Sequence, residues 1–178
     1  ELSKEWDAYW NGKATGPEKM PEYAVGDSLA TRVASGKTIS ALGDMYGNFV
    51  GGSADLQGPN NTNLNAEDFT PENPSGRYIR FGIREFAMTA IGNGIALHGG
   101  LRPFVATFMV FADYLRPALR LSALQNLPLT LVLTHDSIFV GEDGPTHQPI
   151  ETVSALRAIP NVQVLRPGDA QETVEAWK

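Results

Sequence analysis

One loop of this sequence is unusually rich in side chains that can donate or accept protons. Between Thr134 and Pro149 lie two histidines and three acids, together with two glycines and two prolines that favour a shaped loop over a helix. Imidazole and carboxylate groups could bind a metal ion, hydrogen-bond a polar substrate or stabilise local turns, and the spacing leaves all three interpretations open. The ionisable residues are His135, Asp136, Glu142, Asp143 and His147.

Two further groups outside this loop could also carry chemistry. Glu85 follows a strand-like segment and falls in the first turn of an expected helix. An acid there can serve acid–base chemistry or merely compensate the positive end of the helix dipole. Phe108, Phe111 and Tyr114 are spaced three residues apart, so they either fill the core or form a wall for a flat heterocycle.

Several familiar catalytic and binding patterns are absent. The sequence has no phosphate-binding loop of the Walker type and no Gly-x-Ser-x-Gly nucleophile elbow. Gly92-Asn93-Gly94 has no third glycine in register, so it indicates close helix packing rather than dinucleotide binding. The absence of cysteine excludes a disulfide, a thiol nucleophile and Cys-ligated metal sites, and it fits a cytoplasmic protein.

The composition argues against two classes of partner. The formal net charge is −6 and no basic cluster exceeds two residues, which argues against nucleic acid. No segment approaches the ~20 apolar residues of a membrane span, and residues 1–22 lack the apolar stretch of a signal peptide. Charged residues make up only 19% of the chain, against about 25% in an average soluble protein. We therefore expect part of the surface to lie against another domain or partner.

The hydrophobic pattern predicts strands that alternate with helices. A linker or arm over 1–22 precedes the first helix, which has a potential break at Ser35-Gly36, and a polar loop covers 57–76. Alternation of this kind is typical of a doubly wound, mainly parallel α/β sheet with helices on both faces. Strands are expected over 49–56, 77–82, 102–108, 129–135 and 162–166, and helices over 28–44, 83–98, 111–124, 148–158 and 169–177.

The predicted topology gathers the polar and aromatic residues at one edge. In an open parallel sheet, ligands bind outside the carboxyl ends of the strands. Asp55, Glu85, Phe108 and His135 each lie at or just beyond the end of a predicted strand. A carboxylate, aromatic rings and a histidine that meet at this edge make a binding site the preferred interpretation.

Four motifs, in order along the chain, resemble the transketolase family. They are Gly51–Leu56, Phe81–Glu85, Arg120–Leu124 and the loop Thr134–Glu151. The resemblance implies the central domain of these enzymes, which binds the aminopyrimidine of thiamine diphosphate. It runs from about residue 22 to Lys178, so we assign 23–178 to this domain and 1–22 to the link from a preceding domain.

The resemblance implies cofactor roles for five residues. Glu85 matches the glutamate that hydrogen-bonds the ring nitrogen N1′ and so promotes removal of the thiazolium C2 proton. Phe108, Phe111 and Tyr114 match the aromatic pocket around the pyrimidine ring. Asp55 matches an acid near the thiazolium side of the cofactor.

It also implies roles in binding the sugar-phosphate substrate. Arg32 matches an arginine that grips the substrate, a task suited to a planar guanidinium. His135, Asp143 and His147 match residues that hold the hydroxyls of the donor sugar, and the two histidines assist its proton transfers. Two positions depart from the family pattern. Phe86 stands where histidine is frequent, and Pro59 replaces a phosphate-contacting serine, which leaves Asn60 or Asn61 as candidate substitutes.

The family signature for binding the diphosphate is missing. Gly43-Asp44-Met45 lacks the second glycine of that Gly-Asp-Gly motif. The resemblance therefore implies part of a longer, homodimeric transferase of the pentose phosphate pathway, whose absent diphosphate-binding domain holds magnesium, and whose C-terminal domain is also absent. The isolated chain is expected to be inactive. The alternatives are the same domain of a dihydroxyacetone synthase or a deoxyxylulose-phosphate synthase, or a non-catalytic α/β interaction module.

Overall fold

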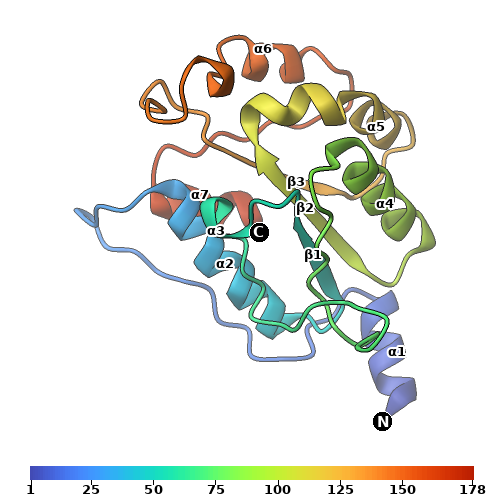
Figure 1. Ribbon diagram of the computed structural model, residues 1–178. Coiled ribbons are helices and arrows are strands. Elements are labelled where there is room, and N and C mark those ends of the chain that lie inside the picture. Colours follow the sequence, from blue (N-terminus) through green and yellow to red (C-terminus); the bar gives the residue numbers. More distant parts are fainter.

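Three parallel strands run through the centre of the computed structural model, which describes residues 1–178 (Figure 1). They are β1 (Phe49–Ser53), β2 (Arg102–Phe108) and β3 (Thr130–Thr134), and they pair in the order β1-β2-β3. Both interfaces of the central strand are parallel, with Val105 opposite Gly52 on one side and Leu131 on the other. All three strands therefore end at the same edge of the sheet.

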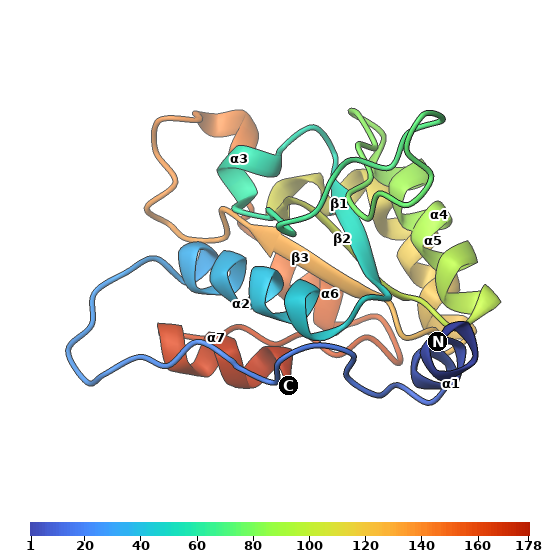
Figure 2. The same cartoon turned by 90° about the horizontal axis from the view of Figure 1, so that it is seen from below.

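Helices cover both faces of this sheet, as the sequence predicts (Figures 1 and 2). Helices α2 (Thr31–Met45) and α7 (Ala170–Trp177) lie on one face. Helices α4 (Glu85–His98), α5 (Ala112–Leu124) and the short α6 (Thr152–Arg157) belong to the other. Neighbouring residues of β2 point to opposite faces, so the molecule has two cores. Phe104 packs in the cluster with Ile39, Leu42, Phe49, Leu64 and Tyr78, and Val105 in the cluster with Met88, Leu115, Leu119 and Leu156.

The first residues form helix α1 (Leu2–Trp10) and an extended arm that lies against the start of the sheet (Figure 2). Arg102 donates a hydrogen bond to the carbonyl of Gly12 at 2.9 Å, and the amide of Thr15 donates to the carbonyl of Met45 at 2.9 Å. The ring of Trp10 approaches Gly99 so closely that an added Cβ would lie 2.8 Å from it. The arm is thus attached to the domain by specific contacts.

Two of the five predicted strands are wrong. Residues 77–82 form only isolated bridges through Tyr78, although they run beside the outer edge of β1. Residues 162–166 form no strand, although Val162 and Val164 pack against the core beside α5 and α6. The alternating side chains produced the predicted pattern, but the backbone of this segment does not pair with β3. The outer edge of β3 is consequently unpaired.

The helices follow the predictions with small shifts. Helix α2 is not broken at Gly36, because this glycine lets the helix approach Asn61, whose carbonyl oxygen would lie 2.3 Å from an added Cβ. The predicted polar loop contains a four-residue helix, α3 (Gln57–Asn60). Helix α7 is capped by Asp169, whose carboxylate accepts a hydrogen bond from the amide of Glu172. None of the helices combines the length and the apolar character needed to cross a membrane.

Candidate functional site

Five aromatic and imidazole rings gather beyond the end of β2. The ring of His135 stacks on that of Phe108 with 3.7 Å between centroids, and the ring of Phe111 stacks on Phe108 with 6.0 Å between centroids. His147 meets Phe111 edge-on at 5.2 Å, and Tyr114 meets the same ring at 6.1 Å. Phe108 is buried, Phe111 is half-buried and Tyr114 is exposed. The structure therefore brings together the predicted aromatic wall and both predicted catalytic histidines.

His135 also lies within hydrogen-bond distance of the predicted substrate arginine. Its Nε2 is 2.9 Å from the Nη1 of Arg32, near the start of α2, and its Nδ1 is 2.9 Å from the Oγ1 of Thr134. The backbone of His135 is left-handed, with φ of 55°. Strained backbone of this kind concentrates at functional sites, because the surroundings must hold it in place.

The surroundings of His135 disfavour its positive charge. Burial lowers the pKa of His135 below its ordinary value, and the positive charge of Arg32 lowers it further. His147 acts in the same direction, whereas the carboxylates of Asp143 and Asp136 partly oppose this shift. The imidazole is therefore poised as a neutral base near neutral pH.

The predicted loop is tied down at its beginning and near its end. Arg166 forms an ion pair with the carboxylate of Asp136 at 2.8 Å and a hydrogen bond to its backbone carbonyl at 3.1 Å. The Gln148 side chain donates to the carbonyl of Val140. Asp143 is exposed and has no hydrogen bond to His135, so within the chain it acts on that residue through charge alone.

Glu85 is the first residue of α4 and is buried, with only 6% of its surface exposed. Its carboxylate makes no salt bridge, and the side-chain hydrogen bonds of the chain do not include it. One turn further along α4, the fully buried hydroxyl of Thr89 is also without a partner. The Glu85 carboxylate is therefore available to a hydrogen-bond donor from outside the chain.

Asp55 lies apart from the ring cluster. It lines a cavity of about 230 Å³ together with Gln57, Tyr78 and Arg80. Like His135, it follows the end of a strand with a left-handed backbone, at φ of 60°. Arg80 is held by an ion pair with Asp68 at 2.5 Å, and the charge of Asp55 contributes to raising the pKa of Arg80. The structure thus places Asp55 at the same sheet edge but in a separate polar recess.

Sequence reasoning missed a set of buried polar residues behind this site. Asn60 is fully buried, with its amide bonded to Ser53 at 2.8 Å and to Thr134 at 2.5 Å. The suggestion that Asn60 replaces the serine lost at Pro59 is therefore wrong, because its amide is used inside the chain. Asn61, with a left-handed φ of 54°, is half-buried. The sequence indicated only that Ser53 and Thr134 lie near the ends of predicted strands, and it did not indicate that Asn60 joins them.

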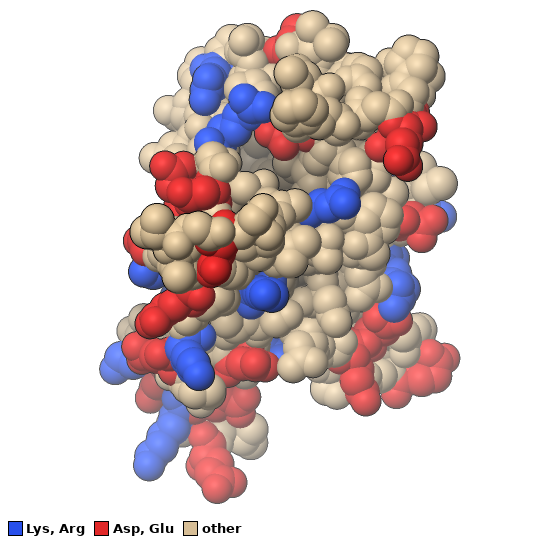
Figure 3. All heavy atoms as spheres, turned by 90° about the vertical axis from the view of Figure 1, so that its left-hand side faces the viewer, with Lys and Arg blue, Asp and Glu red and all other residues tan.

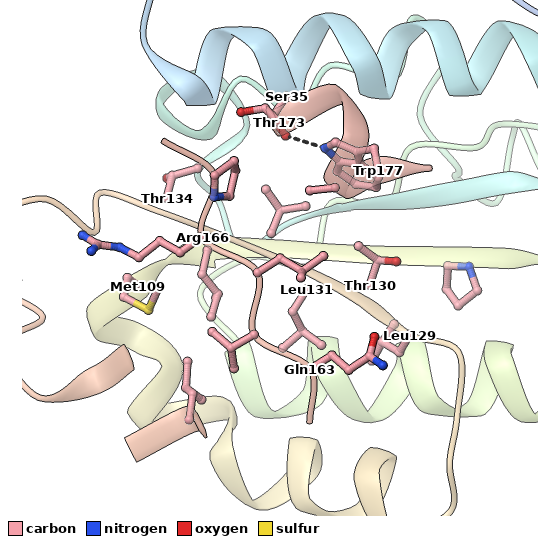
Figure 4. A pocket seen from close by; sticks show the side chains of 18 of the residues that line it. Ser35, Met109, Leu129, Thr130, Leu131, Thr134, Gln163, Arg166, Thr173 and Trp177 are labelled. Atoms are coloured by element: carbon pink, nitrogen blue, oxygen red, sulfur yellow. Dashed lines mark hydrogen bonds between the residues drawn. The ribbon is translucent and has the colours of Figure 1, made fainter. Parts of the chain in front are cut away.

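A cleft of about 1530 Å³ follows the unpaired edge of β3 and reaches this site (Figure 4). Thr130 and Leu131 of β3 line one wall, and Gln163 and Arg166 lie opposite. Arg32, His135 and Asp143 also line it, so three of the four predicted substrate residues share one opening, and His147 lies outside this lining. The face in Figure 3 is hollowed, with acidic and basic side chains interspersed around the hollow. No three His, Asp or Glu side chains lie together in a way that could hold a metal ion.

A parallel α/β sheet with rings, imidazoles and a buried acid at the carboxyl ends of its strands defines a ligand-binding domain of the doubly wound class. The family model for the transketolase pyrimidine-binding domain matches residues 27–178. The chain belongs to this family.

Its relatives are similar along the whole chain. It is 58% identical to the transketolase of Treponema pallidum over 184 residues, which cover 100% of this chain and 28% of that protein. A transketolase of Pichia stipitis in complex with sedoheptulose 7-phosphate superposes with a TM-score of 0.93 at 44% identity, covering 99% of this chain and 28% of the other. The inactive β4 tetramer of a split-gene transketolase superposes with a TM-score of 0.61 at 31% identity, covering 83% and 46%.

These relatives confirm the resemblance to the transketolase family that the four sequence motifs indicated. They are named transketolases, which are transferases, so the two other thiamine enzymes and the non-catalytic module are not favoured. The chain spans about a quarter of the length of the curated relatives it matches, at 28% and 25% of the first two. It is therefore one domain's share of such an enzyme.

Proposed function

We propose that this chain supplies the pyrimidine side of a thiamine diphosphate site, in an enzyme that transfers two-carbon ketol units from ketose phosphates to aldose phosphates. The observation that carries the proposal is Glu85, a buried residue at the carboxyl-end edge of the sheet whose carboxylate has no hydrogen-bond or ion-pair partner within the chain. Bound thiamine diphosphate supplies the nucleophilic carbon that accepts the ketol unit.

The residues present fit the aminopyrimidine of this cofactor. A ring N–H could donate to the Glu85 carboxylate, which has no partner within the chain. Phe108 and Phe111 offer ring faces against which a flat heterocycle can stack, and Tyr114 extends them toward solvent. In this proposal Glu85 holds a proton at N1′, and Asp55 lies toward the thiazolium side.

Three residues that line the cleft, together with His147 from the ring cluster, suit a polyhydroxylated, phosphorylated substrate. Arg32 offers a planar guanidinium at the cleft, which is the group best matched to a phosphate. His135 and His147 offer imidazoles that can accept and return hydroxyl protons, and Asp143 offers an acceptor for a sugar hydroxyl. We assign these four residues to substrate binding and the two histidines also to proton transfer.

The remaining parts of the site belong to other domains and to a second subunit. Helices α4 and α5 expose large apolar side chains that a monomeric domain rarely leaves uncovered, which supports burial in a homodimer. These side chains are Phe86, Ile91, Leu97, Tyr114, Leu121 and Leu124. We assign magnesium and the diphosphate to the absent diphosphate-binding domain. The inactivity of the split-gene β4 tetramer supports our proposal that this chain is inactive alone.

The test is the substitution Glu85→Gln in the complete enzyme that contains this chain. Glutamine keeps the size of the side chain but has no acidic proton, so kcat for ketol transfer should fall by ~10²–10⁴-fold. The matched control is Glu72→Gln, which makes the same change at an exposed loop position. Activity within a factor of two of the parent at saturating thiamine diphosphate and magnesium would refute the assignment.

A further inference from the structure

An unbroken chain of hydrogen bonds runs from the cleft into the interior of the sheet. It starts at the Arg32 guanidinium, passes through four side chains and ends at the backbone carbonyl of Ala106 on β2. The successive distances are 2.9, 2.9, 2.5, 2.8 and 3.1 Å, and the intervening side chains are His135, Thr134, Asn60 and Ser53.

At the two ends of this hydrogen-bonded series, only one assignment of donor and acceptor is possible. A guanidinium has donors and no acceptor, so the Nε2 of His135 must accept from Arg32. A backbone carbonyl can only accept, so the Ser53 hydroxyl must donate to Ala106. Ser53 has no second proton, and it must therefore accept from the amide nitrogen of Asn60.

The groups between the two ends are then fixed as well. With its nitrogen on Ser53, Asn60 turns its oxygen to Thr134, whose hydroxyl donates to it. The Thr134 oxygen is left as the acceptor for the Nδ1–H of His135. Every donor in the chain has one acceptor, and the opposite orientation of Asn60 would leave one contact without a proton. His135 is consequently neutral, with its proton on Nδ1 and the lone pair of Nε2 facing Arg32.

Because the inner side chains of the series are buried, reversing the donor-to-acceptor direction of its hydrogen bonds would be costly. Asn60, Ser53 and Thr134 are 0%, 2% and 7% exposed, so water cannot readily replace a lost partner. A buried polar network of this kind specifies one arrangement because an unpaired member costs about 1–3 kcal/mol. The residue types are also specific, since asparagine offers a donor and an acceptor on opposite sides, whereas aspartate offers two acceptors.

We propose that Thr134 and Asn60 are positioning residues that hold His135 in the Nδ1–H tautomer and, through it, orient the Arg32 guanidinium toward the substrate. The inference rests on the proposed function, in which His135 and Arg32 contact the sugar phosphate. Neither Thr134 nor Asn60 touches the substrate in this account. Their effect reaches it only through the imidazole.

The test is a pair of substitutions at one position of the complete enzyme. Thr134→Val keeps the shape but removes the hydroxyl, so Nδ1–H loses its acceptor and the tautomer is no longer selected. We expect KM for the phosphorylated donor to rise about tenfold, equivalent to ~1.4 kcal/mol, and kcat to fall as well, because His135 is also assigned to proton transfer. Thr134→Ser restores the hydroxyl and should restore KM.

The matched control is Thr38→Val, which makes the same change at another buried threonine, in α2, whose hydroxyl donates only to the carbonyl of Ala34 and which does not line the cleft. Asn60→Asp is the second variant, because it keeps the size and the acceptor for Thr134 but removes the donor to Ser53, and it should also raise KM. A purely structural role would instead lower the melting temperature and leave the KM of the folded enzyme unchanged.

Failure of the inference differs from failure of the proposed function. If His135→Ala leaves KM unchanged, then His135 does not bind substrate, and both its assigned substrate role and the positioning role of Thr134 and Asn60 fall, whereas Glu85→Gln still tests the proposed function. If His135→Ala raises KM while Thr134→Val leaves KM as unchanged as Thr38→Val does, only the positioning role is overturned. Equal losses in Thr134→Val and Thr134→Ser would also overturn it, since packing rather than the hydroxyl would then matter.

Discussion

The imidazole of His135 stacks on the phenyl ring of Phe108, with 3.7 Å between the ring centroids and 26° between the ring planes. Phe108 is the last residue of β2 and pairs in register with Thr134, and His135 directly follows Thr134 at the end of β3. A side chain assigned to the cofactor and one assigned to the substrate therefore share one stack. The sheet itself sets this spacing, because neighbouring strands lie about 4.8 Å apart.

Phe108 should consequently matter for folding as well as for binding. It is only 5% exposed, and Phe108→Ala should lower the free energy of unfolding by about 3–5 kcal/mol through lost burial and the cavity left behind. Phe139→Ala is the control, because Phe139 is 89% exposed, and its change should stay within ~0.5 kcal/mol. Urea unfolding of the 178-residue chain measures both. Equal effects would contradict the burial of Phe108.

The lowered pKa of His135 predicts a loss of stability in mild acid. The folded state binds this proton less readily than the unfolded state, whose pKa is near 6.5. Stability is therefore unaffected above that pH and falls as the pH drops below it. The urea midpoint should decline less between pH 7.5 and 5.5 in His135→Gln than in the parent. His98 and His147 are common to both proteins and cancel in the comparison.

The sequence predicted the parts of the fold that depend on local burial. Residues 102–108 form β2 with the predicted bounds, because this apolar run is buried on both faces. Residues 162–166 show the same local signal on their inner side, yet they form no strand. Strand formation requires a partner ladder, and alternation along one segment carries no information about whether its neighbour accepts the pairing.

The candidate site was predictable to the same extent. The topology rule correctly brought Phe108 and His135 to one edge, because the ends of parallel strands must meet there. It did not predict the role of Asn60, since a polar residue in a Gly- and Pro-containing stretch normally indicates a turn. Its complete burial results from the packing of α3 against β1 and β3, which no local pattern encodes.

Two glycines should respond oppositely to alanine. Gly94 lies on an exposed part of α4 where an added Cβ meets nothing within 4 Å, so Gly94→Ala should stabilise the chain by about 0.5–1 kcal/mol. An added Cβ at Gly52 in β1 would lie 1.9 Å from the backbone oxygen of Ile79. Gly52→Ala should therefore push residues 77–82 away from β1 and destabilise the chain. Thermal unfolding of both variants tests the prediction, and a stable Gly52→Ala protein would contradict the close approach.

The last prediction concerns the tie between Arg166 and Asp136 at the start of the loop that carries Asp143 and His147. Both partners are partly exposed, at 49% and 28% of their side chains, so the ion pair should contribute no more than about 1 kcal/mol to stability. Arg166 also holds the Asp136 carbonyl at 3.1 Å, which fixes the direction in which the loop leaves β3. Its removal should therefore release the loop without unfolding the domain.

Limited proteolysis with chymotrypsin reports this release, because the loop presents Phe139 with 89% of its surface exposed. Arg166→Met should speed cleavage after Phe139 several-fold while the melting temperature changes by only a few degrees, since local opening and global unfolding are separate events. Lys178→Met removes a comparable surface ion pair, formed with Glu175 at 2.7 Å far along the chain from the loop, and should leave the cleavage rate unchanged. If Arg166→Met and Lys178→Met are cleaved at the same rate, Arg166 does not restrain the loop.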